Sequence, residues 1–321
     1  MRTGRLLRLV LAASVTSATL AGSAGAQSST EALAARCVDA GGPVLRCTEL
    51  AVTSRALQGS AGLLAGLGSE VAGSAGTLGR RLGTTPRVAV GARAAFAHVG
   101  LPDLADPGAE PSRQATFVVP AVHAGVGVGV FDGFFVLPTV GGVLSLDLLA
   151  NTSVLFLPTA DGFDGRVAAW TVGARLGLLR ESFTLPGVAV SLAHRDLAPV
   201  SFGDPLAAGG GAVEADATVT SVRATVGKDL LSVGLLAGIG WDRYGGSVTL
   251  RPTGMDAVYE GSFRHSRKLL FGGASMNFLI LQLSAEAGWA QGAGAVSGYR
   301  GAPFDPARGS GYGSLAFRLT I

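Results

Sequence analysis

Apolar and polar side chains alternate along most of the chain, from about residue 87 to the last residue. In the final segment Leu315, Phe317 and Leu319 share one face of an extended chain, while Ser314 and Arg318 share the other. The same pattern recurs in residues 143–154, 168–178 and 279–289. Because successive side chains of a β-strand point to opposite faces, this alternation predicts strands with one apolar and one polar face.

The alternating segments number about ten and are separated by clusters of Gly, Pro, Asp and Ser. They cover residues 87–99, 115–130, 142–157, 165–180, 187–197, 213–227, 230–244, 257–271, 277–290 and 311–321. The strands of a soluble β-sandwich would also alternate apolar and polar residues, but they have about five or six residues. A tilted strand that crosses a membrane needs about 9 to 11 residues. The lengths therefore predict an all-β fold, a closed antiparallel transmembrane β-barrel of about ten strands, within a range of about 8 to 14.

The connections between these segments alternate in length, as in bacterial barrels with short periplasmic turns and longer external loops. The expected external connections are residues 100–114, 158–164, 198–212, 245–256 and 291–310. The expected inner turns include Lys228–Asp229 and residues 272–276, while residues 131–141 do not fit the alternation.

In this topology the aromatic residues fall near the ends of the strands. Trp170, Trp241 and Trp289 lie near the outer ends, whereas Phe131, Phe183, Phe271 and Phe278 lie near the inner ends. This placement predicts two aromatic belts, one at each membrane interface. The alternative is that the 14 Phe and 3 Trp cluster there by chance.

The composition agrees with a membrane protein. Only 15% of the residues are charged and 48% are hydrophobic, whereas soluble domains have about 25% charged residues. Lysine occurs only at Lys228 and Lys268, and the 49 glycines do not recur at every third position. These values exclude a disordered chain and a collagen.

Residues 1–26 indicate a cleaved secretory signal peptide. Arg2, Arg5 and Arg8 precede an apolar run that ends at Leu20, and small residues follow at positions 24–26. An uncleaved anchoring helix is the alternative. Cleavage removes three positive charges from a formal net charge of +3, so the charge implies no nucleic-acid partner.

Residues 27–85 follow a helical rather than a strand period. Leu50, Leu57, Leu64, Val71 and Leu78 recur every seven residues, which predicts a narrow apolar stripe on a helix. Each glycine in such a helix costs about 1 kcal/mol relative to alanine, so the helix needs a surface to pack on. We expect either a plug in the barrel lumen or a periplasmic tail, followed by a barrel domain over residues 86–321.

Cys37 and Cys47 are the only cysteines, and they flank a turn-forming stretch at residues 39–43. In an oxidising periplasm they predict an intramolecular disulfide. Two cysteines without a nearby histidine do not indicate a metal site.

Charged residues on the polar faces of the strands are the candidate lining of the lumen. They are Asp147, Arg175, Arg223, Asp242, Arg264, Lys268, Glu286 and Arg318. Inside the barrel they would form ion pairs or line a solute path. A barrel of about eight strands is filled by side chains and an open channel needs about sixteen, so we expect a narrow or gated lumen and exclude a wide porin.

No enzyme or cofactor motif stands out. The glycine-rich residues 125–129 lack the Lys-Ser/Thr ending of a phosphate-binding loop, and His98, His123, His194 and His265 lack metal-ligand spacing. The best catalytic candidate is His194 with Asp196, near Ser201 and Asp204, as an outer-rim hydrolase. Asp161 and Asp164 could hold Ca²⁺, but a plain turn is the simpler interpretation. We therefore predict no catalytic residues, no cofactor and no metal.

The leader segment, the alternating strands and the apolar pattern of the last strand resemble a Gram-negative outer-membrane β-barrel protein. Over residues 87–321 the chain is similar to small porin-like and fatty-acid-channel-like barrels. The resemblance implies an outer-membrane location, contact with outer-membrane lipid, and recognition of residues 311–321 by the barrel-assembly machinery. Ile321 departs from the aromatic residue with which that family usually ends.

Three functions follow from these observations. We expect passive transport of small or apolar solutes, and the first alternative is a structural or surface-interaction barrel that acts through loops such as residues 100–114 and 291–310. The outer-rim hydrolase is the second alternative.

Overall fold

The computed structural model describes residues 21–81, 85–104, 113–134, 142–182, 185–206, 210–296 and 303–321, with side chains from residue 29 onward. Residues 1–20 of the predicted signal peptide, as well as Phe183, lie outside the described residues.

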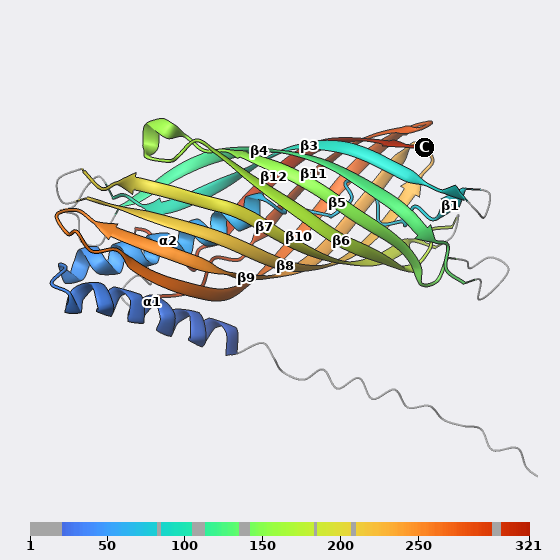
Figure 1. Cartoon of the computed structure of the whole chain (residues 1–321). Helices are drawn as coiled ribbons and strands as arrows, with labels where there is room; N and C mark the ends of the chain where they lie inside the picture. Colours follow the sequence, from blue (N-terminus) through green and yellow to red (C-terminus); the bar gives the residue numbers. More distant parts are fainter. Residues whose placement is uncertain are drawn as a thin grey trace, which may run out of the picture.

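Ten antiparallel strands close into a barrel (Figure 1). They are β3 (Val88–Pro102), β4 (Gln114–Phe131), β5 (Ser145–Phe156), β6 (Arg166–Leu179), β7 (Gly187–Asp204), β8 (Gly211–Leu230), β9 (Val233–Pro252), β10 (Tyr259–Phe278), β11 (Leu281–Ala290) and β12 (Ser310–Thr320). Neighbours in sequence are neighbours in the sheet, and β12 pairs with β3 to remove the last free edge. The predicted fold class is confirmed.

The two shortest connections lie at the same end of the barrel as the C-terminus, which we call the inner end. One turn contains Leu231 and the other Leu279, with φ of 59° and 53°. The turns predicted at Lys228–Asp229 and residues 272–276 were wrong, because β8 and β10 run through them. Glycine at position 273 serves packing rather than a turn, since a Cβ there would lie 2.7 Å from Glu286 Cγ.

The outer surface of the barrel carries an apolar band that ends at a defined level. On β9 the outward-facing Leu235 and Ile239 are 53% and 66% exposed, and Trp241 is 40% exposed. Beyond Trp241 the outward positions become polar, beginning with Arg243. Residues 233–241 match the length that a tilted strand needs to cross the hydrocarbon core. The 20-residue strands β8, β9 and β10 therefore continue past the band at the opposite, outer end.

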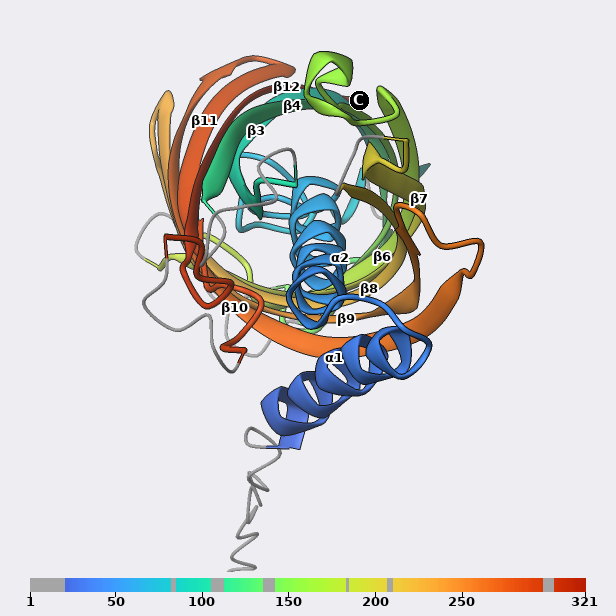
Figure 2. The same ribbon diagram turned by 90° about the vertical axis from the view of Figure 1, so that its left-hand side faces the viewer.

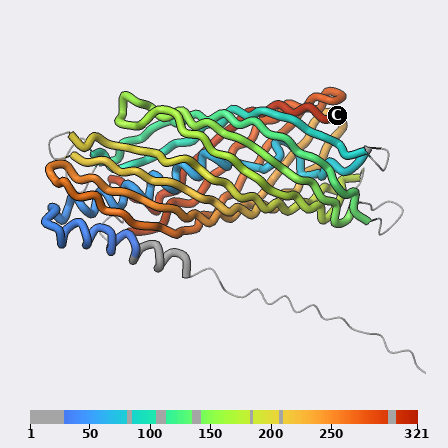
Figure 3. Tube along the Cα trace, viewed as in Figure 1, coloured from blue at the N-terminus to red at the C-terminus, as the bar shows by residue number. Residues whose placement is uncertain are grey.

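Two helices precede the barrel, α1 (Ala21–Asp39) and α2 (Val44–Leu64). Figure 2 looks along the barrel from the outer end and shows α2 inside the ring of strands, whereas α1 leaves the ring and packs on the outer end of β10. The Cα trace in Figure 3 follows the chain from α2 through the lumen to the inner end. There β1 (Arg80–Arg81) and β2 (Thr85–Pro86) form a small sheet before β3 begins. Among the described residues, no helix is both long and apolar enough to cross a membrane.

The helical prediction was right for α1 and α2, which a turn at residues 40–43 separates, and wrong beyond residue 64. Residues 65–79, which we call the luminal segment, form no continuous helix, so Val71 and Leu78 do not extend the predicted stripe. Gly68, Gly73 and Gly79 adopt positive φ angles of 70°, 71° and 66°. These angles are strained for other residues and break a helix. Residues 44–79 lie in the lumen, one of the two predicted positions, whereas α1 lies outside the ring of strands at the outer end.

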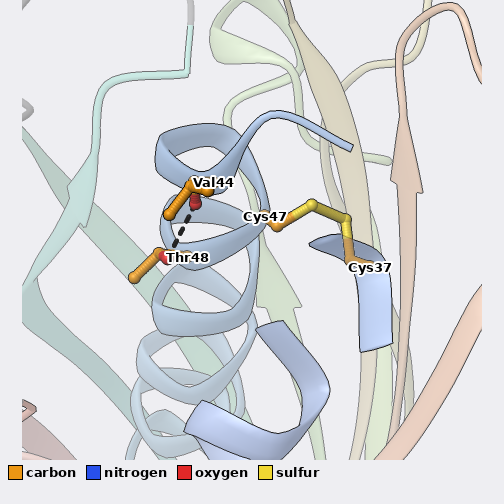
Figure 4. Close-up of a disulfide and its surroundings, with 4 residues drawn as sticks. All are labelled: Cys37, Val44, Cys47 and Thr48. Carbon is orange, nitrogen blue, oxygen red and sulfur yellow. Dashed lines mark hydrogen bonds between the residues drawn. A yellow bond between two sulfur atoms is a disulfide. The ribbon is translucent and has the colours of Figure 1, made fainter. Parts of the chain in front are cut away.

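The predicted disulfide is confirmed. Cys37 on α1 is bonded to Cys47 on α2, with Cα atoms 5.6 Å apart (Figure 4). Gly41, with φ of 95°, allows the tight turn between the helices. At the start of α2, Thr48 Oγ1 donates a hydrogen bond of 2.8 Å to the carbonyl oxygen of Val44. The disulfide therefore ties the helix in the lumen to the helix at the rim.

The hydrophobic core of the protein lies around α2 in the outer half of the lumen. Leu50 and Leu57 are buried and join one cluster with inward-facing Val213, Val248 and Phe263 of the surrounding strands. This packing supplies the surface that the glycine-containing helix requires.

Candidate functional site

Four ion pairs surround the luminal segment in the middle of the barrel. They are Arg93–Glu286, Arg175–Asp147, Arg195–Glu70 and Arg223–Asp242. Seven of these eight side chains belong to the strands, and Glu70 belongs to the luminal segment. All are buried or nearly so, and removal of charges from water is costly unless each charge is paired and hydrogen-bonded.

Asp147 on β5 binds the inner part of the luminal segment. Its carboxylate accepts the backbone N–H of Leu78 at 3.0 Å and the guanidinium of Arg175 at 2.8 Å. Arg175 Nη1 in turn donates to the carbonyl oxygen of Ser74 at 3.2 Å. One ion pair thus holds both an amide and a carbonyl of the same segment.

Glu286 on β11 holds the outer part of the luminal segment in the same way. Its two oxygens accept the backbone N–H groups of Ser69 at 3.0 Å and Gly73 at 3.1 Å. Arg93 Nη2 lies 3.8 Å from Glu286 Oε2 and donates to the carbonyl oxygen of Ser69 at 2.8 Å.

Arg223 on β8 is fully buried and completes the set. It pairs with Asp242 and donates to the carbonyl oxygens of Gly66 at 3.2 Å and Gly68 at 3.3 Å. Asp242 also accepts hydrogen bonds from Ser221 Oγ at 2.6 Å and the Tyr244 hydroxyl at 3.2 Å. Both oxygens of the Asp242 carboxylate therefore accept hydrogen bonds.

The strands recognise the luminal segment mainly through its backbone. Arginines donate to its carbonyl groups and carboxylates accept its amide groups, so that a segment without secondary structure has its polar groups satisfied inside the lumen. Arg318 adds a contact of 3.4 Å to the carbonyl oxygen of Ala72, and Gln282 adds one of 3.2 Å to that of Gly73.

In the outer half of the lumen, α2 is held by close contact. A Cβ at Gly62 would lie 2.7 Å from Tyr244 Cε1, so only glycine allows the helix to approach the wall there. The His265 ring stacks on Tyr244 with centroids 4.8 Å apart, and Arg267 Nη1 donates to the carbonyl oxygen of Gly59 at 2.7 Å.

The structure places six of the eight predicted lumen residues on the inward face of their strands. These are Asp147, Arg175, Arg223, Asp242, Glu286 and Arg318. Arg264 and Lys268 are exposed on the outward face of β10, so the prediction was wrong for these two residues. The reason is that β10 extends past the apolar band at its outer end, where an outward-facing charge meets water and polar headgroups instead of hydrocarbon.

Sequence reasoning missed several lumen residues that the structure reveals. Arg93, Arg195, His265 and Arg267 point inward, as does His123. The strict alternation within each strand would have found Arg195, because it lies between His194 and Asp196, which share the opposite face. Glu70 had no comparable signal, since its position depends on the path of the luminal segment.

The predicted aromatic belt is partly present. Trp170, Trp241 and Trp289 all face outward, 40% to 48% exposed. At the inner end Phe131 and Phe278 also face outward, whereas Phe271 is 4% exposed and points into the barrel. Phe271 was therefore wrongly placed in the inner belt, because it occupies the inward-facing alternate position of β10.

The candidate hydrolase residues lie on the outer wall rather than in a cleft. His194 Nδ1 is 3.5 Å from Thr220 Oγ1, and its ring centroid is 6.2 Å from that of Trp170. Asp204 accepts the backbone N–H of Leu206 at 2.8 Å. In the part of the chain that the structure describes, no three His, Cys, Asp or Glu side chains gather to hold a metal ion.

The loop with Asp161 and Asp164 is organised by an aromatic contact. Phe163 packs between Phe117 and Phe202, with centroids 5.2 Å and 4.6 Å away, while both carboxylates are exposed. This arrangement is that of a turn with a buried aromatic anchor.

Two cavities flank the luminal segment. One of about 90 Å³ lies between this segment and strands that include β3, β4, β5 and β12, with Arg93, His123 and Asn151 in its lining. The other, of about 950 Å³, opens at the inner end, where Arg180, Lys228 and Arg318 contribute to its wall.

No protein-family model matches the chain, and no curated protein matches it. The fold is similar to the translocator domain of the autotransporter NalP from Neisseria meningitidis, with 9% identity over 74% of this chain and 88% of that chain and a TM-score of 0.44. It is also similar to the outer-membrane protease OmpT from Escherichia coli, with 9% identity over 74% and 96% of the two chains and a TM-score of 0.38. It is similar as well to the Pseudomonas putida toluene transporter TodX, with 9% identity over 73% of this chain and 88% of that chain and a TM-score of 0.32.

The architecture of the chain itself defines its class. A closed antiparallel barrel leaves no backbone edge unpaired, and its outer wall presents a continuous apolar band bordered by tryptophans. The protein has the architecture of a transmembrane β-barrel, the kind found in the Gram-negative outer membrane, and in such barrels the tight turns and the C-terminus usually face the periplasm.

Proposed function

We propose that the protein is a gated outer-membrane barrel. Residues 44–79 keep the lumen closed, and small polar or anionic solutes pass when this plug is displaced. The observation that supports the proposal is the polar inner wall, whose arginines and carboxylates bind the plug by its backbone. A lumen that needed only to be filled would be more stable with apolar side chains.

The sequence predicted small or apolar solutes, and the charge of the wall favours small anions over apolar ones. Six arginines on the described strands face the lumen: Arg93, Arg175, Arg195, Arg223, Arg267 and Arg318. Three carboxylates oppose them: Asp147, Asp242 and Glu286. An open lumen would therefore attract small anions.

Planar-bilayer recording tests the proposal. The mature chain should conduct rarely, whereas a variant lacking residues 27–79 should show frequent open events. Glu286→Ala in the full chain provides a second test that keeps the plug, because it removes the acceptor for Ser69 and Gly73 and should raise the opening frequency. Absence of channel events in all three folded proteins would exclude transport.

The alternative is a surface-interaction barrel, and the position of α1 favours it. The Cys37–Cys47 hairpin lies at the end of the barrel opposite the C-terminus, which is the external mouth if the short turns face the periplasm as in bacterial barrels. If transport fails, we expect the hairpin and the neighbouring loops to be the functional part. Cleavage of α1 by trypsin added to intact cells would establish that it is accessible at the surface.

A further inference from the structure

Three cationic side chains gather on the outward face of β9 and β10. Arg243, Arg264 and Lys268 are all exposed. In the strand register Arg243 is paired with Ser266, so that Arg264 and Lys268 are its diagonal neighbours on the same face. Such neighbours have Cα atoms about 7 to 8 Å apart, which is within reach of one shared anionic group. We call these three residues the basic patch.

The groups around the basic patch do not neutralise it. Thr220 of β8 and Ser266 of β10 lie opposite Arg243 and contribute hydroxyl groups. The carboxylate of Asp216 accepts hydrogen bonds from the Ser247 backbone nitrogen at 2.7 Å and the Ser247 hydroxyl at 2.6 Å, and it forms no ion pair with the three cations. None of the three cations forms an ion pair with a carboxylate of the described residues.

The height of the basic patch in the membrane follows from its neighbours. Lys268 lies directly opposite Trp241, the last residue of the apolar band on β9. Tryptophans mark the level at which hydrocarbon gives way to headgroups. The patch begins at this level and faces away from the barrel, toward the headgroups of the outer leaflet.

We propose that the basic patch binds the phosphate groups of a phosphorylated glycolipid in the outer leaflet. Arginine and lysine form short charge-assisted hydrogen bonds with phosphate oxygens. The adjoining apolar wall continues below the patch and would contact the acyl chains of the same lipid. This continuity selects a lipid over free phosphate, which would use only the cations. The site depends on the membrane position of the barrel and is independent of the gating proposal.

Native mass spectrometry of the detergent-solubilised full chain tests the site, with diphosphoryl lipid A as the probe and phosphatidylcholine as the reference lipid. We expect lipid A to bind in preference to phosphatidylcholine. Each cation near an anionic surface adds about a fivefold gain in affinity, so Arg243→Gln/Arg264→Gln/Lys268→Gln should weaken lipid A binding by roughly 100-fold.

A matched control removes three other exposed arginines. Arg166→Gln/Arg251→Gln/Arg308→Gln changes the net charge equally and should alter lipid A affinity less than about threefold if binding is local to the patch. Equal loss in both triple variants would overturn the proposal, because general charge would then explain binding. Complete displacement of lipid A by millimolar inorganic phosphate would also overturn it, since the acyl chains would then contribute nothing.

The single variant Lys268→Gln covers the case in which the triple variant does not fold. It should lower affinity about fivefold. Unchanged affinity in this folded variant, together with unchanged affinity at 0.5 M NaCl in the original protein, would equally reject the site.

Discussion

Arg175 on β6 and Asp147 on β5 form a buried ion pair, with Nη2 2.8 Å from Oδ2, and together they bind the backbone at Leu78 and Ser74. The pair is therefore part of the plug contact as well as part of the wall. Because both side chains are at most 3% exposed, neither charge can be relieved by water if its partner is lost.

Asp147→Asn should destabilise the folded barrel strongly. It leaves the Arg175 guanidinium buried without a counter-charge, which costs about 3 to 5 kcal/mol of unfolding free energy. The urea midpoint in lipid vesicles measures this loss. Glu214→Gln is the control, since its pair with Arg251 is partly exposed to solvent and contributes about 0 to 1 kcal/mol. Similar midpoints for the two variants would mean that the buried pair contributes little.

Removal of residues 27–79 should yield an anion-selective channel. The six arginines and three carboxylates that line the described strands then face water, and the excess positive charge attracts anions. The reversal potential in a salt gradient gives the selectivity directly. A cation-selective channel would contradict the assignment of these side chains to the lumen.

Gly129→Ala should loosen the luminal segment. A Cβ at this position would overlap the backbone of Gly79, which cannot rotate away as a flexible side chain could. Such overpacking costs about 1 to 3 kcal/mol, and it should also raise the frequency of channel opening. Gly311→Ala is the matched control, because no atom lies within 4 Å of the added methyl group. Equal behaviour of both variants would argue against tight packing at Gly79.

Reduction of the Cys37–Cys47 disulfide should free α1 without unfolding the barrel. The cysteines are 10 residues apart, and loop-closure entropy predicts a local stabilisation of about 2 to 3 kcal/mol. Trypsin should then cleave at Arg36 faster, while the thermal unfolding of the barrel stays unchanged. Reductant should have no effect on the Cys37→Ser/Cys47→Ser variant. Loss of barrel stability on reduction would show that α1 contributes to the wall.

His194→Ala should leave lipid and peptide hydrolysis at the level of the unmodified protein. His194 contacts Thr220 and Trp170 on the outer wall, and these neighbours provide no nucleophile–base–carboxylate arrangement. Turnover by the purified protein that disappears in this variant would instead support the outer-rim hydrolase.

The alternation of side chains by itself determined the strands and the closed barrel, because the two faces of a strand in this fold meet different solvents. Leu315, Phe317 and Leu319 could be assigned to the lipid face, and Asp147, Arg175 and Glu286 to the lumen, from their positions alone. The disulfide was equally readable, since Cys37 and Cys47 had no other partner.

The tertiary structure decided what strand alternation could not. Arg264 and Lys268 face outward because β10 continues past the apolar band, and the level of the membrane depends on all strands together. The luminal segment follows the lumen because Asp147, Glu286 and Arg223, far away in sequence, satisfy its amides and carbonyls. Local sequence fixes which face a side chain takes, but only the assembled barrel fixes whether that face meets lipid, water or the chain's own N-terminal segment.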